Sequence, residues 1–280
     1  MARRTFPLRE CALALAVLGV AVPAAPQAIE LQDRPFNEQV LREQGQPVVP
    51  VYEGWYEEED GTKRLCFGYL NANTEESLEI PMGPQNFIEP ASFDGVQPTH
   101  FRPVPPRNYR RDYCVFTITW PEGFGDEDRI RWTLQSRGSP LTAPGHVGAA
   151  YELDNFASPG RGDFAPVLRF GSDGPSAEGR TGVWVGPVSA RVGVPLQIDV
   201  QVEHPLPGSW LLWAKHTGPG DVAFSAHEFR VGEADGKGTT MATFSAPGTY
   251  VIRVQAVNSL GSFDFYCCWT NGYLEVTVEQ

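Results

Sequence analysis

The sequence has few of the residue patterns that mark a known chemistry. It contains no G-x-S-x-G turn, no H-E-x-x-H pair and no glycine-rich nucleotide loop. It also has no C-x-x-C or H-x-x-x-H spacing of the kind that binds zinc. The five histidines are scattered along the chain. We therefore predict no catalytic residue, no metal site and no cofactor, and we expect a protein that is not an enzyme.

Basic residues are also scarce. The chain has 22 Lys and Arg against 34 Asp and Glu, which gives a net charge of −12. A strongly acidic protein repels phosphate backbones and anionic lipid surfaces. We therefore do not expect nucleic acid or an anionic membrane surface as a partner.

Long apolar runs are absent, apart from one stretch near the N-terminus. Arg3, Arg4 and Arg9 precede an apolar run over residues 12–22, and small residues and prolines follow it. This order is typical of a secretory signal peptide, and the run is shorter than the ~20 residues of a membrane span. We predict a signal peptide over residues 1–28, an exported protein in the periplasm or outside the cell, and no membrane span in the mature chain. An N-terminal membrane anchor is the alternative.

Cleavage would leave an even set of cysteines, which are Cys66, Cys114, Cys267 and Cys268. Exported proteins meet an oxidising environment, where thiols pair. We predict a Cys66–Cys114 disulfide that stabilises the fold by ~3–4 kcal/mol. Neighbouring Cα atoms lie about 3.8 Å apart, closer than a relaxed disulfide allows, so a Cys267–Cys268 bond needs a distorted backbone. We favour this vicinal bond. The alternatives pair Cys66 and Cys114 with the C-terminal cysteines, or leave thiols free or metal-bound.

Glycine and proline are abundant, with 29 and 25 residues, and 11% of the chain is aromatic. This composition indicates short strands joined by turns. Apolar residues alternate with other residues at 65–70, 114–120 and 130–134, and Asp60-Gly61 is a hairpin turn signal. We predict a β-sandwich over residues 46–152, preceded by a flexible tether at 29–45. A long proline-rich loop at 83–113 lies inside this sandwich.

The second half shows seven more alternating segments within about 100 residues, which is typical of an immunoglobulin-like sandwich. The predicted strands are 182–191, 195–203, 209–216, 222–225, 239–245, 249–258 and 272–279. We assign this sandwich to residues 181–280, after a linker at 153–180. The predicted fold class is therefore all-β, with two immunoglobulin-like β-sandwich domains in tandem after the signal peptide.

Two stretches of the second half carry a resemblance to a known family. "WLLWAKHTGPGDVAF" and "TTMATFSAPGTYVIRVQAVNSLG", followed by a terminal "LEVTV", resemble the PKD-type immunoglobulin-like repeats of bacterial exported proteins. The match covers about residues 187–280, although the W-x-F-G-D-G turn of other PKD domains is replaced here. "VYEGWYEEEDGTKRLCFGYLNANTEE" resembles a domain of uncharacterised exported bacterial proteins. The PKD-like resemblance implies adhesion, spacing, or contact with protein or glycan.

Two clusters are candidates for ligand binding. The first is the aromatic, cysteine-bearing segment Phe265, Tyr266, Cys267, Cys268 and Trp269, which joins the last two predicted strands. Loops at the end of a sandwich are common binding sites. Phe265 and Trp269 can equally be core residues.

The second cluster is basic and consists of Arg107, Arg110 and Arg111, with Arg102 nearby. It could bind an anionic glycan or an acidic partner, or simply offset nearby acids.

These observations predict a non-catalytic binding or scaffold protein that contacts protein or glycan at the cell envelope. Two alternatives stay open. One is a hydrolase that acts on an extracellular polymer. The other is a copper-handling or redox protein that uses Cys267 and Cys268.

Overall fold

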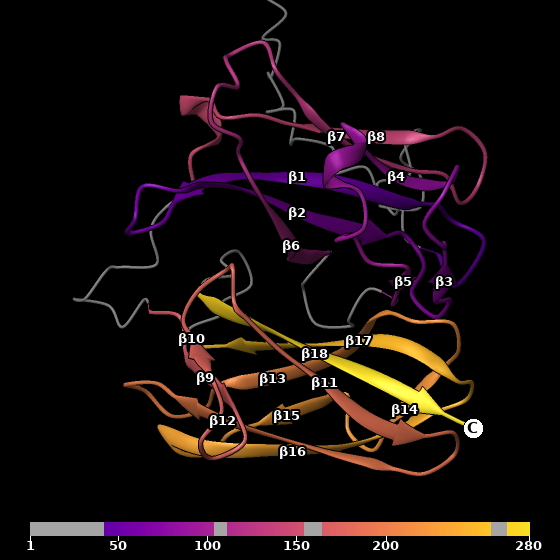
Figure 1. Ribbon diagram of the computed structural model, residues 1–280, viewed down its shortest axis with the longest axis vertical. Coiled ribbons are helices and arrows are strands. Elements are labelled where there is room, and N and C mark those ends of the chain that lie inside the picture. The colour runs from indigo at the N-terminus through magenta and orange to yellow at the C-terminus, as the bar shows by residue number, and fades with distance from the viewer. Residues whose placement is uncertain (1–41, 104–110, 154–163, 259–267) are drawn as a thin grey trace, which may run out of the picture. The chain divides into compact units, whose positions relative to one another are not determined.

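In the computed structural model of the chain, the described residues are 42–103, 111–153, 164–258 and 268–280 (Figure 1). Residues 41–280 form one unit. The predicted signal peptide lies outside the described residues. No described helix is long and apolar enough to cross a membrane.

The first half folds into a sandwich of antiparallel strands (Figure 1). One sheet has the strand order β1-β2-β6, the facing sheet has the order β4-β7-β8, and β3 pairs with β5. The strands are β1 (Val48–Glu57), β2 (Lys63–Asn71), β3 (Leu78–Glu79), β4 (Asn86–Glu89), β5 (His100–Phe101), β6 (Asp112–Thr119), β7 (Ile130–Leu134) and β8 (Leu141–Gly145). Two 3-10 turns, η2 (Ala91–Phe93) and η3 (Ala149–Tyr151), complete it.

Aromatic side chains fill the core of this sandwich. Phe67 of β2 stacks on Phe116 of β6 with ring centroids 5.3 Å apart, and Trp132 of β7 meets Phe116 edge-on at 5.0 Å. The Trp132 indole donates to Oδ1 of the buried Asn86 at 3.0 Å. A buried indole N–H needs such an acceptor. Asn86, the first residue of β4, therefore fixes the position of the Trp132 ring.

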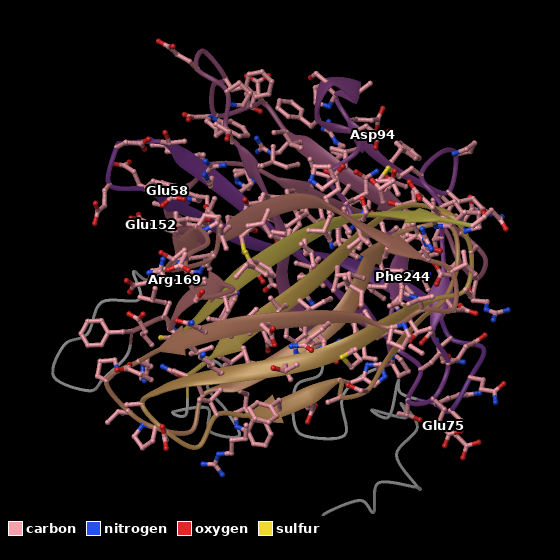
Figure 2. All side chains as sticks on the ribbon, turned by 60° about the horizontal axis from the view of Figure 1, so that its bottom comes forward. Glu58, Glu75, Asp94, Glu152, Arg169 and Phe244 are labelled. Carbon is pink, nitrogen blue, oxygen red and sulfur yellow. A yellow bond between two sulfur atoms is a disulfide. The ribbon has the colours of Figure 1, made fainter. Side chains whose placement is uncertain are left out.

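The second half is a larger sandwich of two five-stranded sheets. The strand orders are β10-β9-β12-β16-β14 and β11-β18-β17-β13-β15, and only β11 and β18 run parallel among these described strands. The bounds are β9 (Val167–Phe170), β10 (Ser176–Ala177), β11 (Val183–Arg191), β12 (Leu196–Glu203), β13 (Trp210–Thr217), β14 (Val222–Phe224), β15 (Glu228–Arg230), β16 (Asp235–Phe244), β17 (Gly248–Val257) and β18 (Trp269–Glu279). Phe244 lies inside this sandwich and is fully buried (Figure 2).

The second sandwich has the hallmarks of an immunoglobulin-like fold. Its sheets place β9, β12, β16 and β14 opposite β18, β17 and β13, which matches the A-B-E-D and G-F-C arrangement. Trp213 is fully buried on β13, the strand in the C position. The Tyr250 hydroxyl at the start of β17 donates to the Ala246 carbonyl at 2.8 Å, which is a tyrosine corner. The chain therefore folds as two immunoglobulin-like β-sandwiches in tandem.

The alternating segments predicted from the sequence form strands, but several short strands were missed. β4 and β5 lie inside the stretch predicted to be a long loop, and β8, which contains Pro144, was not predicted. The two strands of residues 167–177 lie in the predicted linker at 153–180 and pair into the second sandwich, so that prediction is corrected. Four-residue and shorter strands carry too few alternating positions to be recognised.

The end of the predicted tether also departs from expectation. Residues 42–45 are described, and the Arg42 amide donates to the Ala72 carbonyl at 3.1 Å. The Gly45 amide donates to Oε2 of Glu76 at 2.7 Å. These residues are therefore attached to the first sandwich, and residues 29–41 of the tether lie outside the described residues.

Candidate functional site: a pocket lined by both sandwiches

The predicted Cys66–Cys114 disulfide is confirmed. It joins β2 and β6 with the two Cα atoms 5.1 Å apart, and both cysteines are fully buried. This bond excludes the alternative in which these cysteines pair with the C-terminal ones. It packs against Val257 and Trp269 of the second sandwich, so it stands where the two sandwiches meet.

The C-terminal candidate cluster is described only in part, because Phe265, Tyr266 and Cys267 lie outside the described residues. Cys268 is buried and disulfide-bonded, and its φ of 77° is unusual for a residue with a side chain. A locally distorted backbone of this kind is what a vicinal bond requires. The Cys267–Cys268 pairing itself stays a prediction.

Trp269 is buried, with 6% of its surface exposed. Its ring lies 6.1 Å from that of Tyr113, and the Arg180 guanidinium lies 5.7 Å from its centre. The side chain therefore packs between the sandwiches and presents little surface to a ligand. Its position favours the alternative that Trp269 is a core residue.

Of the basic cluster, Arg107 and Arg110 lie outside the described residues. Arg111 pairs with Oε2 of Glu53 at 2.7 Å and lies over the Tyr113 ring. Burial raises the pKa of Glu53 to about 7, although the Arg111 charge acts in the opposite direction. Arg111 thus offsets a buried acid, as one of the two alternatives predicted.

A buried ion cluster joins the two sandwiches. Nε of Arg102 donates to both carboxylate oxygens of Asp112, at 3.0 and 2.9 Å, and Nη2 of Arg253 from β17 reaches Oδ1 at 3.2 Å. Burial acts to raise the pKa of Asp112, but the Arg102 and Arg253 guanidiniums hold it below its usual value. Asp112 is therefore charged at neutral pH and fixes two arginines from different sandwiches.

Side chains of the second sandwich also bind backbone carbonyls of the first. The Tyr273 hydroxyl donates to Val115 at 2.8 Å, and Nδ2 of Asn271 donates to Cys114 at 2.9 Å. Nε2 of His216 lies 2.9 Å from the Val96 carbonyl. Burial lowers the pKa of His216 to about 4, so its ring is neutral and this nitrogen donates. Bonds to fixed backbone atoms give the junction a defined geometry.

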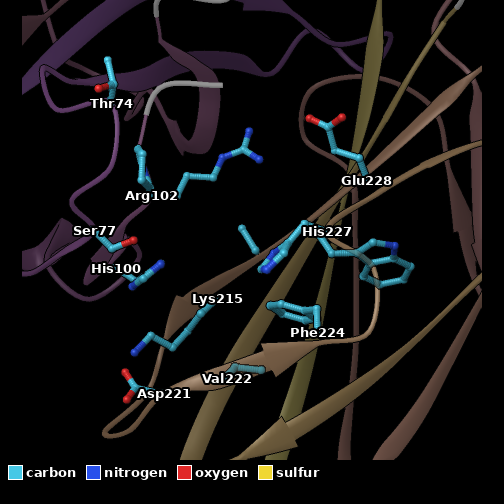
Figure 3. Close-up of a pocket in the computed structure, with 13 residues that line it drawn as sticks. Thr74, Ser77, His100, Arg102, Lys215, Asp221, Val222, Phe224, His227 and Glu228 are labelled. Atoms are coloured by element: carbon cyan, nitrogen blue, oxygen red, sulfur yellow. The ribbon is translucent and has the colours of Figure 1, made fainter. Parts of the chain in front are cut away.

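Beside this junction lies a pocket of about 360 Å³ (Figure 3). The first sandwich contributes residues from the β3–β5 region, and the second contributes residues from β13, β14 and β15. The lining residues are Thr74, Ser77, His100, Arg102, Pro103, Trp213, Ala214, Lys215, Asp221, Val222, Phe224, His227 and Glu228. A volume of this size is within the range of small-molecule sites.

One carboxylate holds the two sides of this pocket together. Glu79 faces His100 across the β3–β5 pair, and its Oε1 lies 2.6 Å from Nδ1 of His100. Nζ of Lys215, from β13, lies 2.6 Å from the same oxygen and also donates to the Gly220 carbonyl at 2.7 Å. Burial acts to raise the pKa of Glu79, but these two partners hold it below its usual value. The charged Glu79 therefore orients both the His100 ring and the Lys215 side chain.

The opposite wall is formed by β14, β15 and the turns beside them. Phe224 is half-buried and meets the exposed His227 ring edge-on at 5.4 Å. Asp221 and Glu228 are exposed and lie on opposite sides of the pocket (Figure 3). Within the described ranges, no cation lies within ion-pair distance of either carboxylate.

Sequence reasoning did not identify this pocket. Glu79 and His100 are 21 residues apart on two-residue strands, and Lys215 is more than 100 residues further on. Among the described residues, no group of three or more His, Cys, Asp or Glu side chains could hold a metal ion.

No family model and no curated protein matches the chain. Among solved structures, the D00-D0 domain of intimin is 9% identical with a TM-score of 0.28, and the match covers 84% of this chain and 100% of that one. Domains 4 and 5 of the S-layer protein SbsC are 12% identical with a TM-score of 0.26, covering 55% of this chain and 66%, just under two thirds, of that one. The titin immunoglobulin tandem A164-A165 is 9% identical with a TM-score of 0.23, covering 84% of this chain and 99% of that one. Values this low support no argument about function.

Proposed function

We propose that the protein is an exported, non-catalytic binding or scaffold protein of the periplasm or cell surface, and that it contacts a protein or a glycan through the pocket beside the junction. In this proposal the second sandwich is a PKD-like module, and the first belongs with domains of other exported bacterial proteins. The observation that carries the proposal is a pocket built by both sandwiches, with its walls fixed by Glu79 and Asp112.

Fixed walls favour binding because little conformational freedom is lost when a ligand enters. Arg102, His100 and Lys215 line the pocket and are already held by carboxylates. The buried Cys66–Cys114 disulfide fits an oxidising environment, which supports export.

The test screens the mature chain on a glycan array and on a peptide array, beside two variants. Ser77→Trp places an indole at an exposed position on the pocket rim. Ser172→Trp makes the same change at an exposed position outside the pocket. We expect the wild type and Ser172→Trp to retain the same ligands, and Ser77→Trp to lose them. The proposal would be contradicted if the wild type bound no ligand on either array, or if Ser77→Trp bound the same ligands as the other two proteins.

A second candidate function is hydrolysis, favoured by one observation. Glu79 orients Nδ1 of His100, and the strand register places Ser77 diagonally across from His100, on the same face as Glu79. This resembles the order of roles in a Ser-His-acid triad. However, no hydrogen bond joins Ser77 to His100 in the structure, and both residues are described. The assay is hydrolysis of p-nitrophenyl esters. Activity that is abolished in Ser77→Ala and preserved in Ser172→Ala would establish this function.

A further inference from the structure

The charges around the pocket argue against a strongly ionic ligand. Arg102 is paired with Asp112, and Lys215 is paired with Glu79. Asp221 and Glu228 have no such partner among the described residues and lie on opposite sides of the pocket, so they do not form a paired site for one cation (Figure 3). The net charge of −12 repels an anionic ligand at longer range.

The hydrogen-bonding groups of the pocket include both donors and acceptors. Thr74 and Ser77 present exposed hydroxyl groups, and Asp221 and Glu228 present exposed carboxylates. Because Nδ1 of His100 is bound to Glu79, Nε2 is the ring nitrogen left for a ligand. A ligand with many hydroxyl groups can use such a mixed set, because each hydroxyl both donates and accepts.

One wall of the pocket is apolar. Phe224 and Val222 of β14 are half-buried, and Pro103 stands on the side of the first sandwich. Behind them, Trp213 is fully buried and supports the wall. An aromatic ring of this kind can receive the C–H face of a sugar ring, while the hydroxyl groups at the edge of the sugar reach polar partners.

From these features we infer that the pocket binds a neutral carbohydrate. One sugar ring lies against Phe224, and its hydroxyl groups donate to Asp221 and Glu228. This inference rests on the proposed function and names the ligand class of the same pocket. A peptide fits less well, because the apolar wall is small and the described cations of the pocket are already paired with carboxylates.

The test uses neutral oligosaccharides, the matched oligosaccharides that carry uronic acids, and a peptide panel, with affinity measured by calorimetry. Glu228→Gln removes a charged acceptor and Phe224→Leu removes the aromatic face. We expect Glu228→Gln to weaken binding of the neutral oligosaccharide by tenfold or more, as is typical for the loss of a hydrogen bond to a charged group. Phe224→Leu should also weaken it, because the sugar ring loses its aromatic contact. Glu233→Gln and Phe229→Leu change exposed residues outside the pocket and should leave the affinity unchanged.

Three outcomes would overturn the inference. If peptides bind and Ser77→Trp abolishes that binding while no glycan binds, the proposed function stands and the carbohydrate assignment fails. If the uronic-acid oligosaccharides bind more tightly than the neutral ones, the charge argument is wrong. If neither panel binds, both proposals fail. Because Glu228 is exposed, Glu228→Gln keeps the test valid even if Phe224→Leu reduces stability.

Discussion

The Asp112 cluster makes a quantitative prediction about how the sandwiches hold together. The side chains of Asp112 and Arg253 are 3% and 4% exposed, and that of Arg102 is 17% exposed. Replacing Asp112 with Asn keeps the size of the side chain but leaves two guanidiniums without a counter-charge. Removing one partner of a buried ion pair typically costs about 3–5 kcal/mol. We expect Asp112→Asn to lower the free energy of unfolding by this amount at pH 7.

The measurement is urea unfolding followed by tryptophan fluorescence and far-ultraviolet circular dichroism. Glu203→Gln is the matched control, because Glu203 is an exposed strand acid, and it should change the free energy by less than about 0.5 kcal/mol. The double variant Asp112→Asn with Arg253→Met removes the more deeply buried arginine charge as well. It should be about 1–3 kcal/mol more stable than the sum of the single changes predicts.

A loss of less than about 1 kcal/mol in Asp112→Asn would refute this reasoning. The guanidiniums would then be solvated well enough without the carboxylate, and the junction would depend on its other hydrogen bonds. If the losses in free energy of unfolding caused by Asp112→Asn and Arg253→Met simply add in the double variant, Asp112 and Arg253 are not coupled across the junction.

Three further predictions concern stability. Glu53 has a folded-state pKa of about 7 against an ordinary value near 4.5, so the stability that its protonated form contributes at low pH is lost as the pH rises between these values. In urea titrations, the free energy of unfolding of Glu53→Gln should therefore rise by up to about 3 kcal/mol relative to that of the wild type between pH 4.5 and pH 8. Changing both Cys66 and Cys114 to Ala should lower the free energy of unfolding by about 4 kcal/mol, because the bond closes a loop of 48 residues in the unfolded chain. Tyr250→Phe removes the hydrogen bond of the tyrosine corner and should cost about 1 kcal/mol by the same assay.

Controls of the same residue type accompany these changes. Glu57→Gln alters an exposed acid on the same strand as Glu53 and should show no pH-dependent gain. Tyr151→Phe alters an exposed tyrosine and should be neutral. A Glu53→Gln variant whose stability follows the wild type at every pH would show that the buried acid titrates normally. A disulfide-free variant as stable as the wild type would contradict the loop-closure estimate.

The long strands were predictable because burial imposes a period of two on their sequence. Leu65, Phe67 and Tyr69 alternate toward the core of the first sandwich, and the A-P-G-T-Y stretch marks the tyrosine corner of the second. The pocket was not predictable, because it depends on contacts between distant and short segments. Asp112 and Arg253 are 141 residues apart, and no local pattern relates them.

The candidate ligand residues illustrate a different limit. An aromatic residue near a loop has the same sequence signature whether it faces solvent or packs inside. Trp269 was a candidate for ligand contact, and its burial against the disulfide is decided by the neighbouring sandwich. Phe224 ends the PKD-like stretch "WLLWAKHTGPGDVAF" and was predicted only as a strand residue, because the sequence does not show that its side chain lines a pocket.

The position of β18 has a consequence for the order in which the two sandwiches fold. This strand lies between β11 and β17, and its Asn271 and Tyr273 side chains bind backbone carbonyls of the first sandwich. The core of the first sandwich is made by residues that all precede the second sandwich in the chain. The second sandwich cannot complete its sheet, and the junction cannot form, until the chain has been made beyond Tyr273. Until then the surface of β6 that faces the junction is exposed to solvent or to a chaperone, and the pocket does not yet exist.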